Sequence, residues 1–215
     1  LRDTLLKSVD YDPKKFGLSR GTRLAKRYSA DTRMADEMAR HFGIKPLTVH
    51  VTDLIPSVLT VLPDSPPVLV IGEPLYRTLS DSQKRFAFAW GCKLAASGLV
   101  PFVSMGKAGL PALWVALMQQ FEPTFFINGV DADETVSLSA SLRKNMPRKA
   151  REELFGAGLE CAGDQRIDVS SLYRDISSFA DRAALLGCGD MAGALQFVWV
   201  VSSGEEPYNS DYTAS

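Results

Sequence analysis

One stretch of sequence decides the fold: VLVIG at residues 68–72, a short bend, and then SDSQKRFAFAWGCKL at residues 80–94. The first five residues form a continuous apolar run, which is typical of a strand buried on both faces. Ser80, followed three residues later by Gln83, has the pattern of a helix capping box. Apolar residues at spacing i, i+4, i+8 form one stripe of the helix that follows. The stretch therefore predicts a buried strand that leads into a core helix.

The rest of the chain adds further helices and few strands. A rough spacing of three to four apolar residues predicts a helix over Ser19–Phe42, with Ser19 as its N-cap and Gly43 as its stop. Alternating β-branched residues predict strands at 47–51 and 57–62. The other expected helices lie within 103–121, 131–145, 147–161 and 169–201, the last with a break near Gly187 and Gly189. The sequence therefore predicts an α+β fold, rich in helices, with a small sheet and an N-terminal helical extension.

The bulk composition bounds the class of protein. A chain of 215 residues with 46% hydrophobic and 23% charged residues can bury one sizeable core. Its formal charge of −1 gives no overall attraction to nucleic acid or to a membrane surface. Its apolar stretches are broken well short of the 18 or so residues that a membrane helix needs. We therefore expect no membrane contact and regard nucleic acid as an unlikely partner.

The cysteines and the chain ends carry weaker information. Cys92, Cys161 and Cys188 are odd in number and widely spaced, which favours a reducing compartment, and we expect a cytoplasmic location. The chain opens with Leu1 and ends in a polar run, so we expect a fragment of a longer protein. The predicted organisation is a basic helical extension at 1–44, a domain at 45–202 and a polar tail at 203–215.

The N-terminal segment is the most basic part of the chain. Residues 1–45 contain eleven lysines and arginines against six acids, a net charge of +5. The simplest interpretation is a solvated helix face. A second interpretation is a face that binds an acidic protein surface while the apolar stripe docks on the domain. That basic face comprises Arg20, Arg23, Lys26 and Arg27, and the apolar stripe comprises Leu24, Tyr28, Met34, Met38 and Phe42.

The order of motifs resembles a known family. The buried strand, the helix entry Leu79-Ser80, the apolar helix and the later Phe179-Ala180-Asp181-Arg182 follow one another as in the zincin metallopeptidases. That family includes the bacterial heat-shock membrane proteases and the CAAX prenyl endopeptidases. Its members carry His-Glu-x-x-His on the first helix and Glu-x-x-Ala-Asp on a later one. The resemblance covers roughly Lys45–Leu195 and implies a zincin-like fold.

The same resemblance implies that the catalytic chemistry has been lost. Trp90 and Leu94 stand at the two zinc histidines, Gly91 at the general-base glutamate and Ser177 at the third ligand. Catalytic zinc needs three protein ligands and a water position, and tryptophan and leucine offer no ligand atom. Asp181 matches the family's supporting aspartate, and we expect its carboxylate near the first helix, paired with the Trp90 N–H or with Arg182. The implied protein is a degenerate peptidase without metal or other cofactor.

No other catalytic centre is evident in the sequence. The only histidines, His41 and His50, are expected at a helix end and on a strand, where a lone histidine is rarely a ligand. No phosphate-binding loop and no dinucleotide fingerprint occurs. We therefore assign no catalytic residue and no metal ligand, and we expect a pseudoenzyme rather than an enzyme.

Binding is the function that these observations favour. We expect a catalytically inactive peptidase-like domain that acts as a protein-binding or scaffolding module within a larger bacterial protein. Such segments resemble the terminal domains of long tetratricopeptide-repeat proteins. The partner would be another protein or the remainder of the same chain. One alternative is a hydrolase of unrecognised type that uses a non-zinc site in the old cleft. Another is a nucleic-acid-binding module that uses the basic N-terminal segment.

Overall fold

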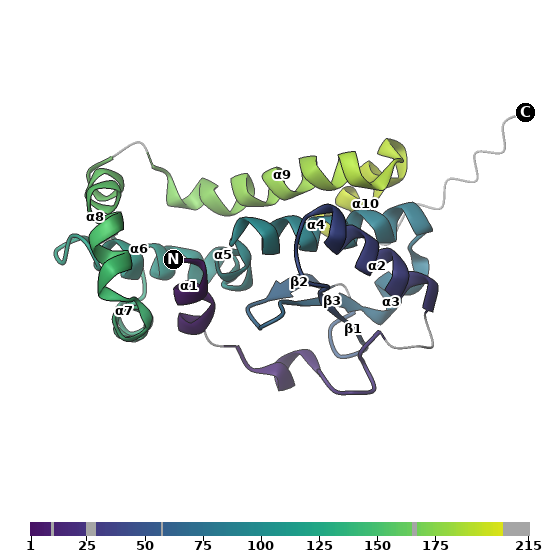
Figure 1. Ribbon diagram of the computed structural model, residues 1–215, viewed down its shortest axis with the longest axis horizontal. Coiled ribbons are helices and arrows are strands. Elements are labelled where there is room, and N and C mark those ends of the chain that lie inside the picture. Colours follow the sequence, from purple (N-terminus) through teal and green to yellow (C-terminus); the bar gives the residue numbers. More distant parts are fainter. Residues whose placement is uncertain (10, 25–28, 57, 165–166, 204–215) are drawn as a thin grey trace, which may run out of the picture.

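A computed structural model describes residues 1–9, 11–24, 29–56, 58–164 and 167–203. It shows a helix-rich α+β fold with a small three-stranded mixed sheet, as predicted (Figure 1). The strands are β1 (Thr48–Thr52), β2 (Leu59–Leu62) and β3 (Val68–Gly72). The helices are α1 (Arg2–Ser8), a 3-10 helix (Pro13–Phe16), α2 (Ser29–His41), α3 (Glu73–Thr78), α4 (Asp81–Ser97), α5 (Val100–Ser104), α6 (Gly106–Met118), α7 (Ala132–Asn145), α8 (Arg148–Gly163), α9 (Val169–Cys188) and α10 (Met191–Ser203).

The central strand of the sheet is the apolar run at 68–72. β3 lies between β1, to which it is parallel, and β2, to which it is antiparallel. Successive side chains point to opposite faces of a strand. Leu69 and Ile71 accordingly enter the main core, while Val68 and Val70 enter a smaller cluster on the other face. Burial on both faces explains why this strand carries no polar residue.

Helix α4 is the centre of the fold. It begins at the predicted capping box, in which the Ser80 and Gln83 side chains each accept a hydrogen bond from the other residue's backbone N–H. It ends before Gly98, whose φ of 70° is the left-handed conformation that favours glycine. The sequence indicated one apolar stripe, but residues 86–92 are buried around the whole helix. α2, α9, α10 and β2 all pack against it, so α4 has no solvent face over these turns.

The segment before α2 differs from the predicted helix, which was to begin at Ser19. The hydroxyls of Ser19 and Thr22 instead accept each other's backbone N–H groups in a local turn. Such side-chain bonds compete with helix formation. The chain then runs along the edge of β1, where the Leu24 N–H donates to the Val49 carbonyl at 2.7 Å and the Val51 N–H donates to the Thr22 carbonyl at 2.8 Å. This pairing protects a sheet edge that would otherwise be open.

The N-terminal segments contribute to the same core as the rest of the chain. α1 packs on α7 and α2 packs on α4, and the residues near the 3-10 helix cover the second face of the sheet (Figure 1). Met34 and Met38 of the predicted apolar stripe are buried, Leu24 is buried and Phe42 is partly buried, whereas Tyr28 lies outside the described residues. The domain boundary near residue 44 stays a prediction, and residues on its two sides share one core.

The two C-terminal helices close the fold over α4. α9 runs antiparallel to it, and small residues allow a close approach: a Cβ on Gly187 would lie 3.2 Å from that of Ala89. The chain then turns at Gly189, whose φ is 74°, close to the predicted break. α10 is fixed to α4 by an edge-to-face contact between Phe197 and Phe86, with ring centroids 5.4 Å apart.

Candidate functional site

The three positions that the resemblance assigns to the zinc-binding helix lie in the hydrophobic core. Leu94 is 0% exposed and Trp90 is 7% exposed. Gly91 faces the sheet, where an added Cβ would lie 3.2 Å from methyl groups of Leu47 and Leu69. Gly91 therefore lies against the sheet, Trp90 and Leu94 are buried in the core around α4, and no ligand could reach these positions without displacing packed side chains.

The two remaining positions lie on α9. Ser177 and Asp181 are one helical turn apart, and both are half-buried. The predicted partners of Asp181 are wrong for the described residues, among which no hydrogen bond or ion pair joins its carboxylate to Trp90 or Arg182. Ala180 and Ala184 are fully buried and mark the buried face of α9, whereas Asp181, next to Ala180 in the helix, is only half-buried. Burial raises the pKa of Asp181 from its ordinary value of 3.8 to about 6.

The raised pKa of Asp181 makes the stability of the protein depend on pH in a defined direction. The stability that Asp181 contributes in its protonated form is fully present below the pKa that this residue has in the unfolded chain, near 3.8. It is lost as pH rises through about 6, the pKa of Asp181 in the folded protein. We expect Asp181→Asn to raise the free energy of unfolding by about 1 kcal/mol at pH 7.5, a value reduced for solvent screening because the group is only half-buried. Urea denaturation at pH 7.5 and at pH 4 measures this. An equal effect at both pH values would contradict it.

The histidines and cysteines are not arranged as a reactive centre within the part of the chain that the structure describes. The Nδ1 atom of His50 lies 2.9 Å from the Thr22 hydroxyl, and its pKa is lowered by burial and by the nearby charge of Arg23. Burial raises the pKa of the Cys92 thiol to about 12, so it is not a thiolate at neutral pH. Among the described residues, no three or more histidine, cysteine, aspartate or glutamate side chains are grouped so that they could hold a metal ion.

The predicted basic face is described only in part. Arg20 lies in the turn that begins at Ser19, and Arg23 lies on the segment paired with β1; both are exposed. Lys26 and Arg27 lie outside the described residues. The helix that was predicted to hold all four on one face does not include Arg20 or Arg23: a turn presents Arg20, and the segment paired with β1 presents Arg23.

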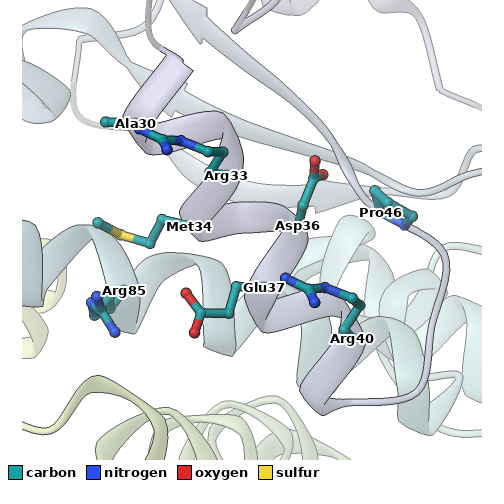
Figure 2. Close-up of a pocket in the computed structure, with 8 residues that line it drawn as sticks. All are labelled: Ala30, Arg33, Met34, Asp36, Glu37, Arg40, Pro46 and Arg85. Atoms are coloured by element: carbon teal, nitrogen blue, oxygen red, sulfur yellow. The ribbon is translucent and has the colours of Figure 1, made fainter.

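A charged groove lies between α2 and α4. Its volume is about 830 Å³, and Figure 2 shows its arginine and carboxylate side chains projecting from α2, with a further arginine contributed by α4. Among the described residues, no ion pair joins Arg40 or Arg85 to a carboxylate. Guanidinium groups can bind carboxylates or phosphates, and the mixed charge of the groove would also require a ligand with donor groups. The lining residues are Ala30, Arg33, Met34, Asp36, Glu37, Arg40, Pro46 and Arg85.

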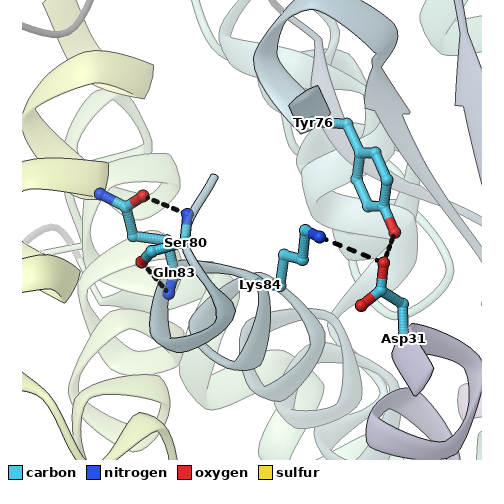
Figure 3. Close-up of polar contacts among 5 residues, drawn as sticks. All are labelled: Asp31, Tyr76, Ser80, Gln83 and Lys84. Atoms are coloured by element: carbon cyan, nitrogen blue, oxygen red, sulfur yellow. Dashed lines mark hydrogen bonds and ion pairs between the residues drawn. The ribbon is translucent and has the colours of Figure 1, made fainter. Parts of the chain in front are cut away.

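A buried polar cluster ties α2 to α3 and α4 (Figure 3). The Tyr76 hydroxyl donates a hydrogen bond to the Asp31 carboxylate. The Lys84 ammonium lies 3.2 Å from the same carboxylate oxygen and 4.9 Å from the centre of the Tyr76 ring. Asp31 and Tyr76 are buried, and the Lys84 side chain is 17% exposed. No local sequence pattern predicts this cluster, because Tyr76 and Lys84 are 45 and 53 residues from Asp31.

The cluster is expected to hold the three helices together. Asp31→Ala would remove the carboxylate that accepts from the Tyr76 hydroxyl and pairs with the Lys84 ammonium, and loss of one partner of a buried pair is costly. We expect the free energy of unfolding to fall by about 2–3 kcal/mol in urea denaturation. Glu73→Ala is the matched control, because its ion pair with Arg77 is exposed and should contribute less than about 1 kcal/mol. Equal effects of the two substitutions would contradict a structural role for the cluster.

The outer face of α10 is an exposed apolar surface. Met191, Leu195 and Trp199 are 66%, 55% and 65% exposed, and Leu186 at the end of α9 is 88% exposed. The first three are spaced i, i+4, i+8 and form one stripe of the helix. We call Met191, Leu195 and Trp199 the α10 surface. The sequence did not reveal it, because α10 is apolar on its buried side as well, so no contrast between faces marks the exposed one.

Few charged residues lie along this part of the chain. Between Arg182 and the end of α10, Asp190 is the only charged residue. Its carboxylate is held at the start of α10, where it accepts hydrogen bonds from the Gly193 N–H at 3.0 Å and the Ser82 hydroxyl at 2.9 Å. These two bonds lower the pKa of Asp190. Large apolar side chains exposed on one helix face are typical of a contact surface for another macromolecule.

Comparisons with known proteins do not place the chain in a family. No protein-family model matches it, and neither a curated protein nor a solved structure matches it significantly. Within the described ranges, every helix is too short or too polar to cross a bilayer.

Proposed function

We propose that the chain is a protein-binding module, built on a peptidase-like framework that lacks the catalytic groups, and that it binds through the α10 surface. The observation that carries the proposal is the exposed stripe of Met191, Leu195 and Trp199. Large apolar and aromatic side chains are the residues that contribute most at protein interfaces. Three such side chains in a stripe on one helix could all be buried in a single contact with a partner protein.

The positions at the old peptidase site support the same proposal. A hydrolase in that cleft would need reactive groups accessible to substrate. Trp90, Gly91 and Leu94 are instead buried in the core, and the Cys92 thiol has a pKa far above neutral. The nucleic-acid alternative draws its support from the basic segment, of which Arg20 and Arg23 are exposed. Two exposed arginines do not favour nucleic acid over an acidic protein surface.

The proposal extends to the wider setting of the module. A partner protein, or another part of a longer bacterial chain such as a tetratricopeptide-repeat protein, would cover the α10 surface. The three cysteines are unpaired, which is consistent with a reducing compartment such as the cytoplasm.

Site-specific photo-crosslinking tests the proposal. A photoreactive amino acid at Ala192, which is exposed on the outer side of α10, would react with any protein that covers this surface. The same amino acid at Val136, which is 68% exposed on α7, is the control. In cells that produce the protein natively, we expect one discrete product from position 192, identified by mass spectrometry, and none from position 136. Absence of a product from position 192 would contradict the proposal.

A further inference from the structure

We propose that the charged groove between α2 and α4 binds a small zwitterion with one additional acid group, which is the chemistry of an acidic amino acid. The site goes beyond the proposed protein-binding function, because none of its residues lies on α10. Three features carry the inference: opposite charges that face each other without pairing, a net positive charge, and walls that a buried polar cluster holds in place.

Two opposite charges face each other across the groove. Glu37 projects from α2 toward the side where Arg85 lies on α4, and both residues are partly buried (Figure 2). Within the part of the chain that the structure describes, neither side chain makes an ion pair or a hydrogen bond. A charge that is withdrawn from water needs a counter-charge. A ligand ammonium against Glu37 and a ligand carboxylate against Arg85 would supply both counter-charges at once.

The net charge of the groove calls for a further acid group on the ligand. Three arginines and two carboxylates line the groove and give it a net charge of +1. For the described residues, exposed Arg40 makes no ion pair with Asp36, although the spacing i, i+4 with the acid first favours one. The same spacing does join Glu73 to Arg77 at 2.6 Å on α3. Arg40 is therefore available to a second ligand carboxylate.

The size and the mixed charge of the groove narrow the class of ligand. Its volume of about 830 Å³ lies within the range of about 300–1,000 Å³ that is usual for small-molecule sites. Met34 and Pro46 offer apolar contacts for the methylene groups of an amino-acid side chain. A phosphate or a nucleotide would bring several negative charges and no ammonium, so Asp36 and Glu37 would repel it. An acidic amino acid satisfies both signs of charge.

The buried polar cluster holds the two walls of the groove together. Asp31, which follows Ala30 of the groove on α2, accepts a hydrogen bond from Tyr76. It also pairs with Lys84, which precedes Arg85 of the groove on α4. Charged groups that project from such fixed helices need little reorganisation to bind a ligand.

Calorimetric titration of the purified chain with L-glutamate tests the site. We expect saturable binding of one molecule per chain. Glutarate lacks the ammonium and L-glutamine lacks the second carboxylate, so each should bind at least about tenfold more weakly than L-glutamate. L-Lysine, whose net charge has the same sign as that of the groove, should not bind.

Substitutions in the groove assign the contacts. Arg85→Gln and Glu37→Gln should each weaken the binding of L-glutamate about tenfold or more, because each removes a charge-assisted contact. Arg40→Gln changes an exposed side chain, so it should leave the fold intact. It should weaken the binding of L-glutamate but not that of L-glutamine. Arg77→Gln, which removes an exposed arginine outside the groove, is the control and should bind as the wild type does.

Three results would overturn the inference. They are the absence of saturable binding at millimolar L-glutamate, binding of glutarate as tight as that of L-glutamate, and equal affinities of the wild type and Arg85→Gln. These results leave the proposed function untouched, because the crosslinking test at Ala192 uses residues outside the groove.

Discussion

Gly91→Glu is expected to prevent folding. This substitution restores the general-base residue of a zinc peptidase to the position that the resemblance assigns to it. A Cβ at residue 91 would already lie 3.2 Å from methyl groups of Leu47 and Leu69, so a longer side chain must push α4 away from the sheet. Its carboxylate would also be buried without a partner. We expect a loss of about 5 kcal/mol or more, which is comparable to the whole stability of many domains.

Two substitutions separate the causes of this effect. Gly156→Glu places the same residue on α8, where an added Cβ meets nothing within 4 Å, and it should leave the free energy of unfolding within about 1 kcal/mol of the wild type. Gly91→Ala adds only the Cβ, whose tight contacts are offset in part by better helix propensity, and it should still fold. Circular dichroism and urea denaturation measure all three. A folded Gly91→Glu protein of wild-type stability would show that α4 faces a cleft.

Gly72→Ala is expected to cost about 4 kcal/mol or more. Gly72 ends β3 and precedes α3, and its φ of −63° is open to any residue. Its need for glycine comes from a close approach, because a Cβ there would lie 1.9 Å from the Pro56 carbonyl oxygen. That oxygen belongs to the backbone, and the Gly72 N–H also donates to the Val58 carbonyl at 2.8 Å. Neither the Pro56 backbone nor the Gly72 backbone can therefore move away without disturbing these contacts.

The matched control for Gly72→Ala is a glycine-to-alanine substitution at a position where the new Cβ meets no other atom. Gly156→Ala lies within α8 with no atom within 4 Å of the new Cβ, and alanine is the better helix former. We expect it to stabilise the protein by about 0.5–1 kcal/mol. Thermal or urea denaturation of the two variants gives the comparison. Similar small effects would contradict the close approach of the chain over Gly72.

The core elements could be predicted from the sequence because their signals are local. The apolar run at 68–72 predicted β3, and the capping box at Ser80 predicted the start of α4. The segment from Ser19 to Leu24 was predicted wrongly as helix. It is a turn followed by a short stretch that pairs with β1, and no local pattern encodes this pairing with a strand some 25 residues away.

The buried polar cluster and the α10 surface were also harder to predict than the core elements. The cluster of Asp31, Tyr76 and Lys84 joins residues that are distant in sequence, so only the packing of α2 on α4 brings them together. The exposed stripe of α10 is hidden within a helix that is apolar on its buried side as well. The positions on α4 could be judged from residue type alone, because tryptophan and leucine cannot bind a metal wherever they lie.

The claim that the chain binds proteins through the α10 surface is tested most directly by one measurement. The yield of the product crosslinked from Ala192 is compared between the wild type and Trp199→Lys. Trp199 is 65% exposed, so its replacement should leave the melting temperature unchanged while placing a charge within the contact. The account predicts that the product is lost. A product that persists at the wild-type yield would contradict it.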